Sequence, residues 1–302
     1  MVGVSVAPAV LIMLAVSVQF ALQAPINARL AVTTGRVPAA LVSFLVGVVG
    51  LAVAVLASGG ADGFADIGEA EAWQFMGGII GAAFVLTALA AVPIVGAGGV
   101  AAATITGQMV GSIVLDARGW IGLDVEPVSA LRIGGAVLLL AGTALILRRR
   151  DRNEAGGTGH RLAAGLIVLA GLALAAQAPI NAGLGDAIGG LEAALVNFVV
   201  GSVVLAVAVV AVRGLPGVGA ARRVPRRYLL GGLIGAVYVA ASVLLVRTVG
   251  AGGIAATTIT GQLAASVALD RAGALGLEER PLTPLRLAAV GLLIAGTVLV
   301  VA

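Results

Sequence analysis

Ten apolar stretches, each roughly 20 residues long, dominate the sequence, and few charged residues interrupt them. A stretch of this length matches an α-helix that crosses the hydrocarbon core of a bilayer. The apolar residues are continuous instead of alternating with polar ones, which favours helices over the strands of a membrane barrel. The ten expected spans are 10–30, 37–57, 72–92, 98–116, 131–147, 162–184, 191–212, 228–246, 252–270 and 285–301. The sequence therefore predicts an all-α polytopic membrane protein with ten transmembrane helices.

The composition excludes most classes of soluble protein. Charged residues make up 11% of the chain, against about 25% in an ordinary soluble domain, so they are too few to cover a water-exposed surface. The net charge is only +4 and aromatic residues make up 3%, which argues against a nucleic-acid partner. The chain has no cysteine and one histidine, His160, and no nucleophile accompanies a base within the spans. We therefore expect no enzymatic activity, no metal site and no cofactor.

The second half of the sequence repeats the first at a constant offset of 154 residues. The segment Gln-Ala-Pro-Ile-Asn at 23–27 returns at 177–181. The longest match joins 95–116 to 249–270, where 15 of 22 positions are identical without a gap. The chain is therefore a duplicated unit of five spans.

Because five is an odd number, the second copy must enter the membrane with the opposite orientation. Arginine placement supports this independently, since loops on the inner side of a membrane are rich in arginine. With both termini outside, 15 of the 18 arginines lie inside, and the exceptions are Arg118, Arg132 and Arg247. Inverted repeats of this kind place a transport site near the middle of the membrane, between the two copies. The expected parts are a first repeat (1–147), an Arg-rich cytoplasmic linker (148–161) and a second, inverted repeat (162–302).

Each copy carries a Gln-Ala-Pro-Ile-Asn turn and a segment of the form Gly-Ala-Gly-Gly…Thr-Ile-Thr-Gly-Gln…Asp. With five spans per copy, these motifs resemble the YdcZ-like family of the drug/metabolite transporter superfamily, in a fused two-copy form. The resemblance covers essentially the whole chain and implies a multi-pass transporter of the bacterial cytoplasmic (inner) membrane that exports small molecules. It also implies a monomer, because the two repeats form an internal pseudo-dimer, with a small-molecule solute and the lipid bilayer as its partners.

Polar side chains within a span are costly unless they are paired, so each one is a candidate for a functional site. Gln23 and Asn27 are four residues apart and share a helix face, and Gln177 and Asn181 repeat them in the second copy. A proline between the two amides of each copy frees a carbonyl one turn back. These groups are predicted to bind a substrate hydroxyl, amine or cation. The alternative is that the amides bond across the helix pair and hold the two copies together.

A second row of polar residues follows the fourth and the ninth span, with members four residues apart. The rows are Thr104, Gln108, Ser112 and Asp116, and then Thr258, Gln262, Ser266 and Asp270. Each row rises about 18 Å, from the middle of the membrane to one surface. We expect the threonines and glutamines to line two approaches to one binding site, and Asp116 or Asp270 to couple transport to protons or cations. The alternative is that these groups satisfy neighbouring backbone and that each aspartate simply ends its helix near the headgroups.

No aspartate or glutamate is expected in the middle of a span, so a site made of amides favours a neutral or zwitterionic polar solute. We therefore predict a transporter of the drug/metabolite type that exports a small polar metabolite by alternating access. A flippase for a lipid-linked substrate, an ion channel and a membrane scaffold are the alternatives.

Overall fold

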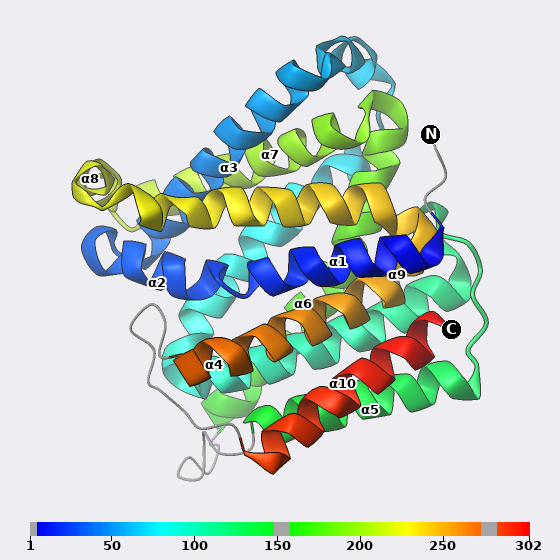
Figure 1. The fold of residues 1–302 in the computed structure, drawn as a ribbon. Helices are drawn as coiled ribbons and strands as arrows, with labels where there is room; N and C mark the ends of the chain where they lie inside the picture. The colour runs from blue at the N-terminus through cyan, green and yellow to red at the C-terminus, as the bar shows by residue number, and fades with distance from the viewer. Residues whose placement is uncertain (1–4, 148–157, 273–282) are drawn as a thin grey trace. The chain divides into compact units, whose positions relative to one another are not determined.

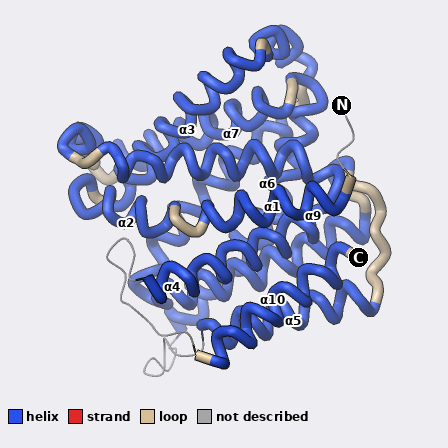
Figure 2. Tube along the Cα trace, in the orientation of Figure 1, coloured by secondary structure: helices blue, strands red, loops and turns tan. Residues whose placement is uncertain are grey.

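A computed structural model describes residues 5–147, 158–272 and 283–302 (Figure 1). These residues form α-helices, short 3-10 helices and connecting turns, and no strand occurs among them (Figure 2). The predicted all-α fold is thereby confirmed. The α-helices are α1 (Val6–Phe20), α2 (Gln23–Thr34), α3 (Arg36–Ser58), α4 (Met76–Arg118), α5 (Ala130–Leu147), α6 (Thr158–Ile188), α7 (Gly190–Ala211), α8 (Leu215–Ala220), α9 (Leu230–Ala272) and α10 (Pro284–Val301).

Seven of the described helical stretches are long and apolar enough to cross a membrane. They are Val6–Thr34, Arg36–Ser58, Ala72–Val95, Gly99–Arg118, Thr158–Ile188, Gly190–Ala211 and Arg226–Leu269. Two shorter apolar helices, Ala130–Leu145 and Leu287–Val301, accompany them. The chain is therefore a polytopic helical membrane protein, and the total of ten spans stays a prediction.

The helix boundaries differ from the expected spans in two places. The expected spans 72–92 and 98–116 belong to the single helix α4, and the expected spans 228–246 and 252–270 belong to α9. In α9 the helical backbone is interrupted at Gly250, with φ 72° and ψ 169°. Glycine adopts such positive φ values readily because it has no Cβ. A single glycine with positive φ is therefore enough to interrupt α9 between the two expected spans.

The first expected span, 10–30, is divided into α1 and α2. The division falls at Ala21, whose carbonyl lies one turn before Pro25 and thus lacks the N–H that would normally bond it. The equivalent Pro179 lies inside α6, which continues past it without interruption. The same proline motif therefore has different local effects in the two copies.

The chain divides into two compact units, and each unit contains segments from both sequence copies. The predicted domains 1–147, 148–161 and 162–302 describe the sequence repeat, and residues 148–157 of the predicted linker lie outside the described residues. Unit 1 comprises Met1–Ala21, Thr87–Ala176 and Leu245–Ala302, and unit 2 comprises Leu22–Leu86 and Gln177–Leu244.

In unit 2, helices α3 and α7 pack against each other and run antiparallel. Gly47 of α3 lies against the ring of Phe198, and Gly201 of α7 lies against the ring of Phe44. The two ring centroids are 5.0 Å apart. Positions that ascend along α3 meet positions that descend along α7, which establishes the antiparallel direction. These contacts are equivalent under the offset of 154, so the same residues of the two copies form the centre of this unit.

In unit 1, helices α5 and α10 are equivalent segments of the two copies and also run antiparallel (Figure 1). Gly135 lies against Gly296, and Gly142 lies against Ala289 and Leu293. Small residues at such contacts let two helix backbones approach closely. Both units therefore contain a pair of equivalent helices packed in opposite directions.

Replacing Gly232 with alanine should destabilise unit 2. A Cβ at this position would overlap the Ser43 carbonyl oxygen and would lie 2.9 Å from Val46 Cβ. Because the backbone of α3 cannot easily move away from the added Cβ, we expect a loss of about 1–3 kcal/mol in the free energy of unfolding. Thermal unfolding of the detergent-purified protein measures this loss.

The matched control is Gly165→Ala. Gly165 is an exposed glycine of α6, and a Cβ there meets no atom within 4 Å. Its replacement should be neutral or stabilising by up to about 1 kcal/mol, because alanine is the better helix former. Equal losses at both positions would contradict the close packing described for Gly232.

Candidate functional site

The glutamines of the two Gln-Ala-Pro-Ile-Asn motifs donate hydrogen bonds from one copy to the other within unit 2. Gln23 Nε2 donates to the carbonyl oxygen of Gly231 at 3.2 Å. Gln177 Nε2 donates to the carbonyl oxygen of Gly77 at 3.0 Å. The two bonds are equivalent under the offset of 154. Each copy therefore satisfies an amide on a backbone carbonyl of the other copy.

The asparagines of the same motifs have different surroundings in the two copies. Asn181 Nδ2 donates to Asn197 Oδ1 at 3.1 Å, and the same oxygen accepts from Gln177 Nε2 at 3.3 Å. Asn27 Oδ1 is buried and has no hydrogen-bond partner. The position equivalent to Asn197 is occupied by Ser43, which has a short hydroxyl side chain and no amide group. The amides of the second copy are therefore bonded to one another, whereas the first copy leaves an unpaired acceptor.

Glycines leave room for the amides of both motifs. The Asn181 amide oxygen occupies the place that a Cβ of residue 77 would need, and the Asn27 amide oxygen does the same at Gly231. Any larger residue at Gly77 or Gly231 would therefore displace an amide. Glycine at these positions therefore gives the amides space, in addition to allowing close helix packing.

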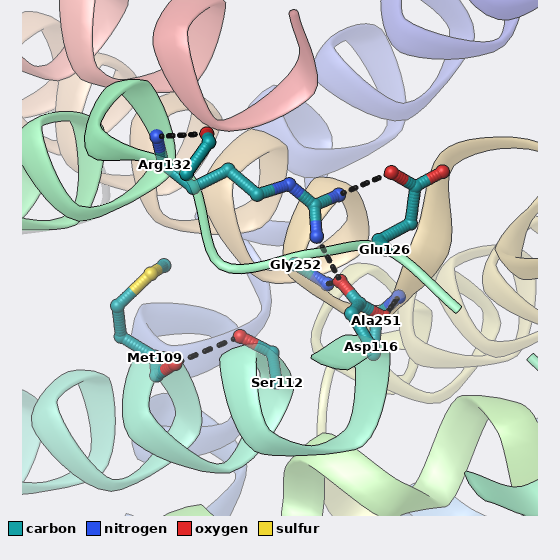
Figure 3. A network of polar contacts seen from close by, with 8 residues as sticks. Met109, Ser112, Asp116, Glu126, Arg132, Ala251 and Gly252 are labelled. Carbon is teal, nitrogen blue, oxygen red and sulfur yellow. Dashed lines mark hydrogen bonds and ion pairs between the residues drawn. The ribbon is translucent and has the colours of Figure 1, made fainter. Parts of the chain in front are cut away.

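A second polar centre lies within unit 1, at the end of α4 (Figure 3). The Asp116 carboxylate accepts hydrogen bonds from the backbone N–H groups of Ala251 and Gly252, both at 2.8 Å. The Arg132 guanidinium lies 3.8 Å from the same carboxylate and 3.7 Å from that of Glu126. The Asp116 side chain is 1% exposed and that of Arg132 is 14% exposed. A buried carboxylate is thus paired with a cation and two backbone donors.

The two N–H groups belong to the first residues after the interruption of α9 at Gly250. Such groups have no partner within their own helix, and a carboxylate satisfies them with the favourable sign of the helix dipole. The Asp116 carboxylate is therefore bonded into the packing of unit 1. A coupling role for Asp116 stays a prediction.

Two of the four hydroxyls in the predicted polar rows bond to their own helices. Ser112 donates to the carbonyl of Met109, and Ser266 donates to the carbonyl of Leu263. The hydroxyl of Thr104 is buried without a partner. Satisfaction of neighbouring backbone, the structural alternative, thus accounts for both serines.

The remaining members of these rows differ in burial. Gln108 and Gln262 are half-buried, and Thr258 is buried and makes a polar interaction. The side chain of Asp270 lies outside the described residues. All these residues belong to unit 1, whereas Gln23, Asn27, Gln177 and Asn181 belong to unit 2. The structure thus places the two predicted groups in different units, and within unit 2 each copy contributes one glutamine–asparagine pair.

The family described as "Putative inner membrane exporter, YdcZ" matches the sequence twice, over residues 8–145 and 162–299. The chain belongs to this family. It is a two-copy YdcZ protein, a multi-pass transporter of the inner membrane, as the repeated motifs implied.

One solved structure, described as "Crystal structure of protein", is similar to the chain with a TM-score of 0.74 and 13% sequence identity. The similarity covers 98% of this chain and 96% of that chain. At this level of identity it concerns the fold. A search of curated proteins gives no significant match.

Asn197 and Arg132 belong to these polar centres but were not among the residues that the sequence pattern singled out as site candidates. Asn197 is a mid-helix amide, and its difference from Ser43 was the signal that could have found it. Arg132 was noted only as an exception to the charge bias. An arginine on the side of the membrane that holds few other arginines indicates a specific local partner.

Asn197→Ala should lower the stability of the protein because it leaves the buried Asn181 amide without its acceptor. We expect a loss of about 1–3 kcal/mol in the free energy of unfolding. Thermal unfolding provides the measurement, with Ser43→Ala at the equivalent position as the control. The loss should be clearly smaller for Ser43→Ala, and a loss of the same size would mean that the amide contact contributes nothing specific.

Proposed function

We propose that this YdcZ protein exports a small polar solute, neutral or zwitterionic, by alternating access. The solute binds in unit 2 at the amide side chains of Gln23, Asn27, Gln177 and Asn181. The observation that carries the proposal is the buried oxygen of Asn27 that no protein donor satisfies. A buried acceptor without a partner costs free energy, so a ligand that donates an O–H or N–H group to it gains affinity.

The chemistry of these four residues favours an uncharged or internally neutralised ligand. Their side chains are amides, which donate and accept hydrogen bonds but carry no charge. The buried carboxylates among the described residues lie elsewhere: Asp116 is at the end of α4, and Glu192 is in the first turn of α7 beside Gly189. A cation bound by these amides would therefore meet no opposite charge on the amides themselves.

The arrangement of equivalent helices supports an inverted pair of five-span repeats. A repeat related to its copy by a two-fold axis in the membrane plane must place equivalent helices antiparallel. The α3–α7 contacts in unit 2 and the α5–α10 contacts in unit 1 have this direction. Each unit, taken alone, thus carries the signature of inversion.

Helix lengths support the count of ten spans. Helices α4 and α9 contain 43 residues each, or about 65 Å of helix, while one crossing needs about 30 Å. Each therefore supplies two spans. Together with one span from α1 and α2, and one each from α3, α5, α6, α7 and α10, they make ten.

Thermal unfolding in the presence of candidate solutes tests the site. The panel contains amino acids, polyols, amines and soluble lipid headgroups, each at increasing concentration. A neutral or zwitterionic solute should stabilise the protein, by about 2.7 kcal/mol at 100 times its Kd. The stabilisation should disappear in Asn27→Ala.

The matched control is Ser17→Ala. Ser17 is a buried serine of α1 whose hydroxyl donates to the Met13 carbonyl within its own helix, so its loss should leave the solute effect intact. A solute effect that survives both Asn27→Ala and Asn181→Ala would place the binding site elsewhere. Stabilisation by headgroups alone would favour the flippase, and no stabilisation at all would favour a scaffold.

A further inference from the structure

One end of α4, from the first copy, is held to α9, from the second copy, by charged groups within unit 1. The Asp116 carboxylate accepts from the N–H groups of Ala251 and Gly252. In the same region the Arg247 guanidinium donates to the carbonyls of Ile121, at 3.2 Å, and Gly122. Hydrogen bonds that involve a charged partner are stronger than those between neutral groups. We call these contacts the Asp116 latch; its residues are Asp116, Ile121, Gly122, Glu126, Arg132, Arg247, Ala251 and Gly252.

The latch accounts for cations that the charge bias of the sequence does not explain. Three arginines, Arg118, Arg132 and Arg247, are left on the outer side by the expected orientation. Two of them, Arg132 and Arg247, bind latch groups. The third, Arg118, lies over the ring of Trp120, 5.7 Å from its centroid. Each exception to the charge bias thus has a local contact.

The backbone of the latch is held in a strained conformation. Ile121 has φ 60°, a region that a β-branched residue rarely occupies. Strain of this kind persists where the surrounding contacts enforce it. The Arg247 guanidinium supplies such a contact at the Ile121 carbonyl, so releasing Arg247 would also release the strained segment.

The sequence makes this contact one-sided. The residue equivalent to Arg247 in the first copy is Pro93, which has no side-chain donor and no backbone N–H. The residue equivalent to Glu126 in the second copy is Arg280, of the opposite charge. The Arg247 part of the latch therefore has no counterpart under the offset of 154.

We propose that the Asp116 latch holds one end of the transporter closed at rest and that Arg247 determines which end this is. The inference rests on the proposed alternating access: a contact between the two copies at one end opposes opening at that end. Without Arg247 the two ends would be more nearly equivalent, and the end beside Asp116 would open more often.

The absence of cysteine from the chain allows a direct test with single cysteines. Ser112 is fully buried one turn before Asp116, and Ser112→Cys places a thiol beneath the latch. Ser266→Cys is the equivalent change in the second copy. Ser266 lies 15 residues beyond Ala251 along α9, so about 22 Å separate it from the latch end of that helix. The rate of reaction with N-ethylmaleimide reports how often each thiol is exposed.

Arg247→Met removes the donors while keeping a side chain of similar length. It should raise the labelling rate of Ser112→Cys at least tenfold, which corresponds to about 1.4 kcal/mol of latch free energy, and should lower that of Ser266→Cys. Asp116→Asn, which weakens the pairing with Arg132, should change both rates in the same directions. Arg118→Met is the matched control and should change neither rate.

The outcomes separate the latch from the transport mechanism on which it rests. Unchanged labelling of Ser112→Cys in folded Arg247→Met protein, as judged by its thermal unfolding, would overturn the latch and leave the proposed export untouched. Faster labelling of Ser112→Cys with no change at Ser266→Cys would support the latch but contradict alternation between two ends.

Discussion

The hydrocarbon core of a membrane offers no hydrogen-bond partners, so buried donors and acceptors must find theirs inside the protein. This requirement organises both polar centres. In unit 2, Gln23 and Gln177 each donate to a backbone carbonyl of the opposite copy. The glutamine amides have room to reach these carbonyls because Gly81 and Gly235 lack the Cβ that would meet Gln177 Nε2 and Gln23 Nε2. The pairing of the two copies in unit 2 therefore depends on glycine as much as on glutamine. At the Asp116 centre, the same requirement is met by a carboxylate that satisfies a helix N-terminus.

Contacts that are equivalent in the two copies stabilise the fold, whereas contacts that occur in one copy alone account for the functional differences between the copies. Positions that match in the two copies, such as Phe44 with Phe198 and Gly47 with Gly201, form the packed centre of unit 2. Positions that differ carry the unequal features: Ser43 against Asn197 decides which asparagine stays unpaired, and Pro93 against Arg247 decides which end has the extra donor. A fused chain can vary one copy alone, which a dimer of identical units cannot do.

The sequence was enough to predict the helical membrane fold and the duplication. Long apolar runs and a constant offset are properties of the chain itself, so they can be read without a structure. The partners of Asp116 could not be predicted in this way, because Ala251 lies 135 residues away in the sequence. Asn197 was missed for another reason: the comparison of the copies drew attention to residues that they share. The interruption of α9 falls at Gly250, and the sequence could not single it out from Gly252 and Gly253, since any glycine accepts a positive φ.

The central claim is that the two copies have opposite orientations, and the sidedness of equivalent positions tests it most directly. Ala65 and Gly219 are equivalent under the offset of 154, and both are exposed. Cysteines introduced at these positions, one at a time, can be labelled in intact and in lysed cells with a maleimide that does not cross membranes. An inverted pair predicts that the cysteine at position 65 reacts in intact cells and that the cysteine at position 219 reacts only after lysis. Reaction of both from the same side would mean that the two copies are parallel and would contradict the account.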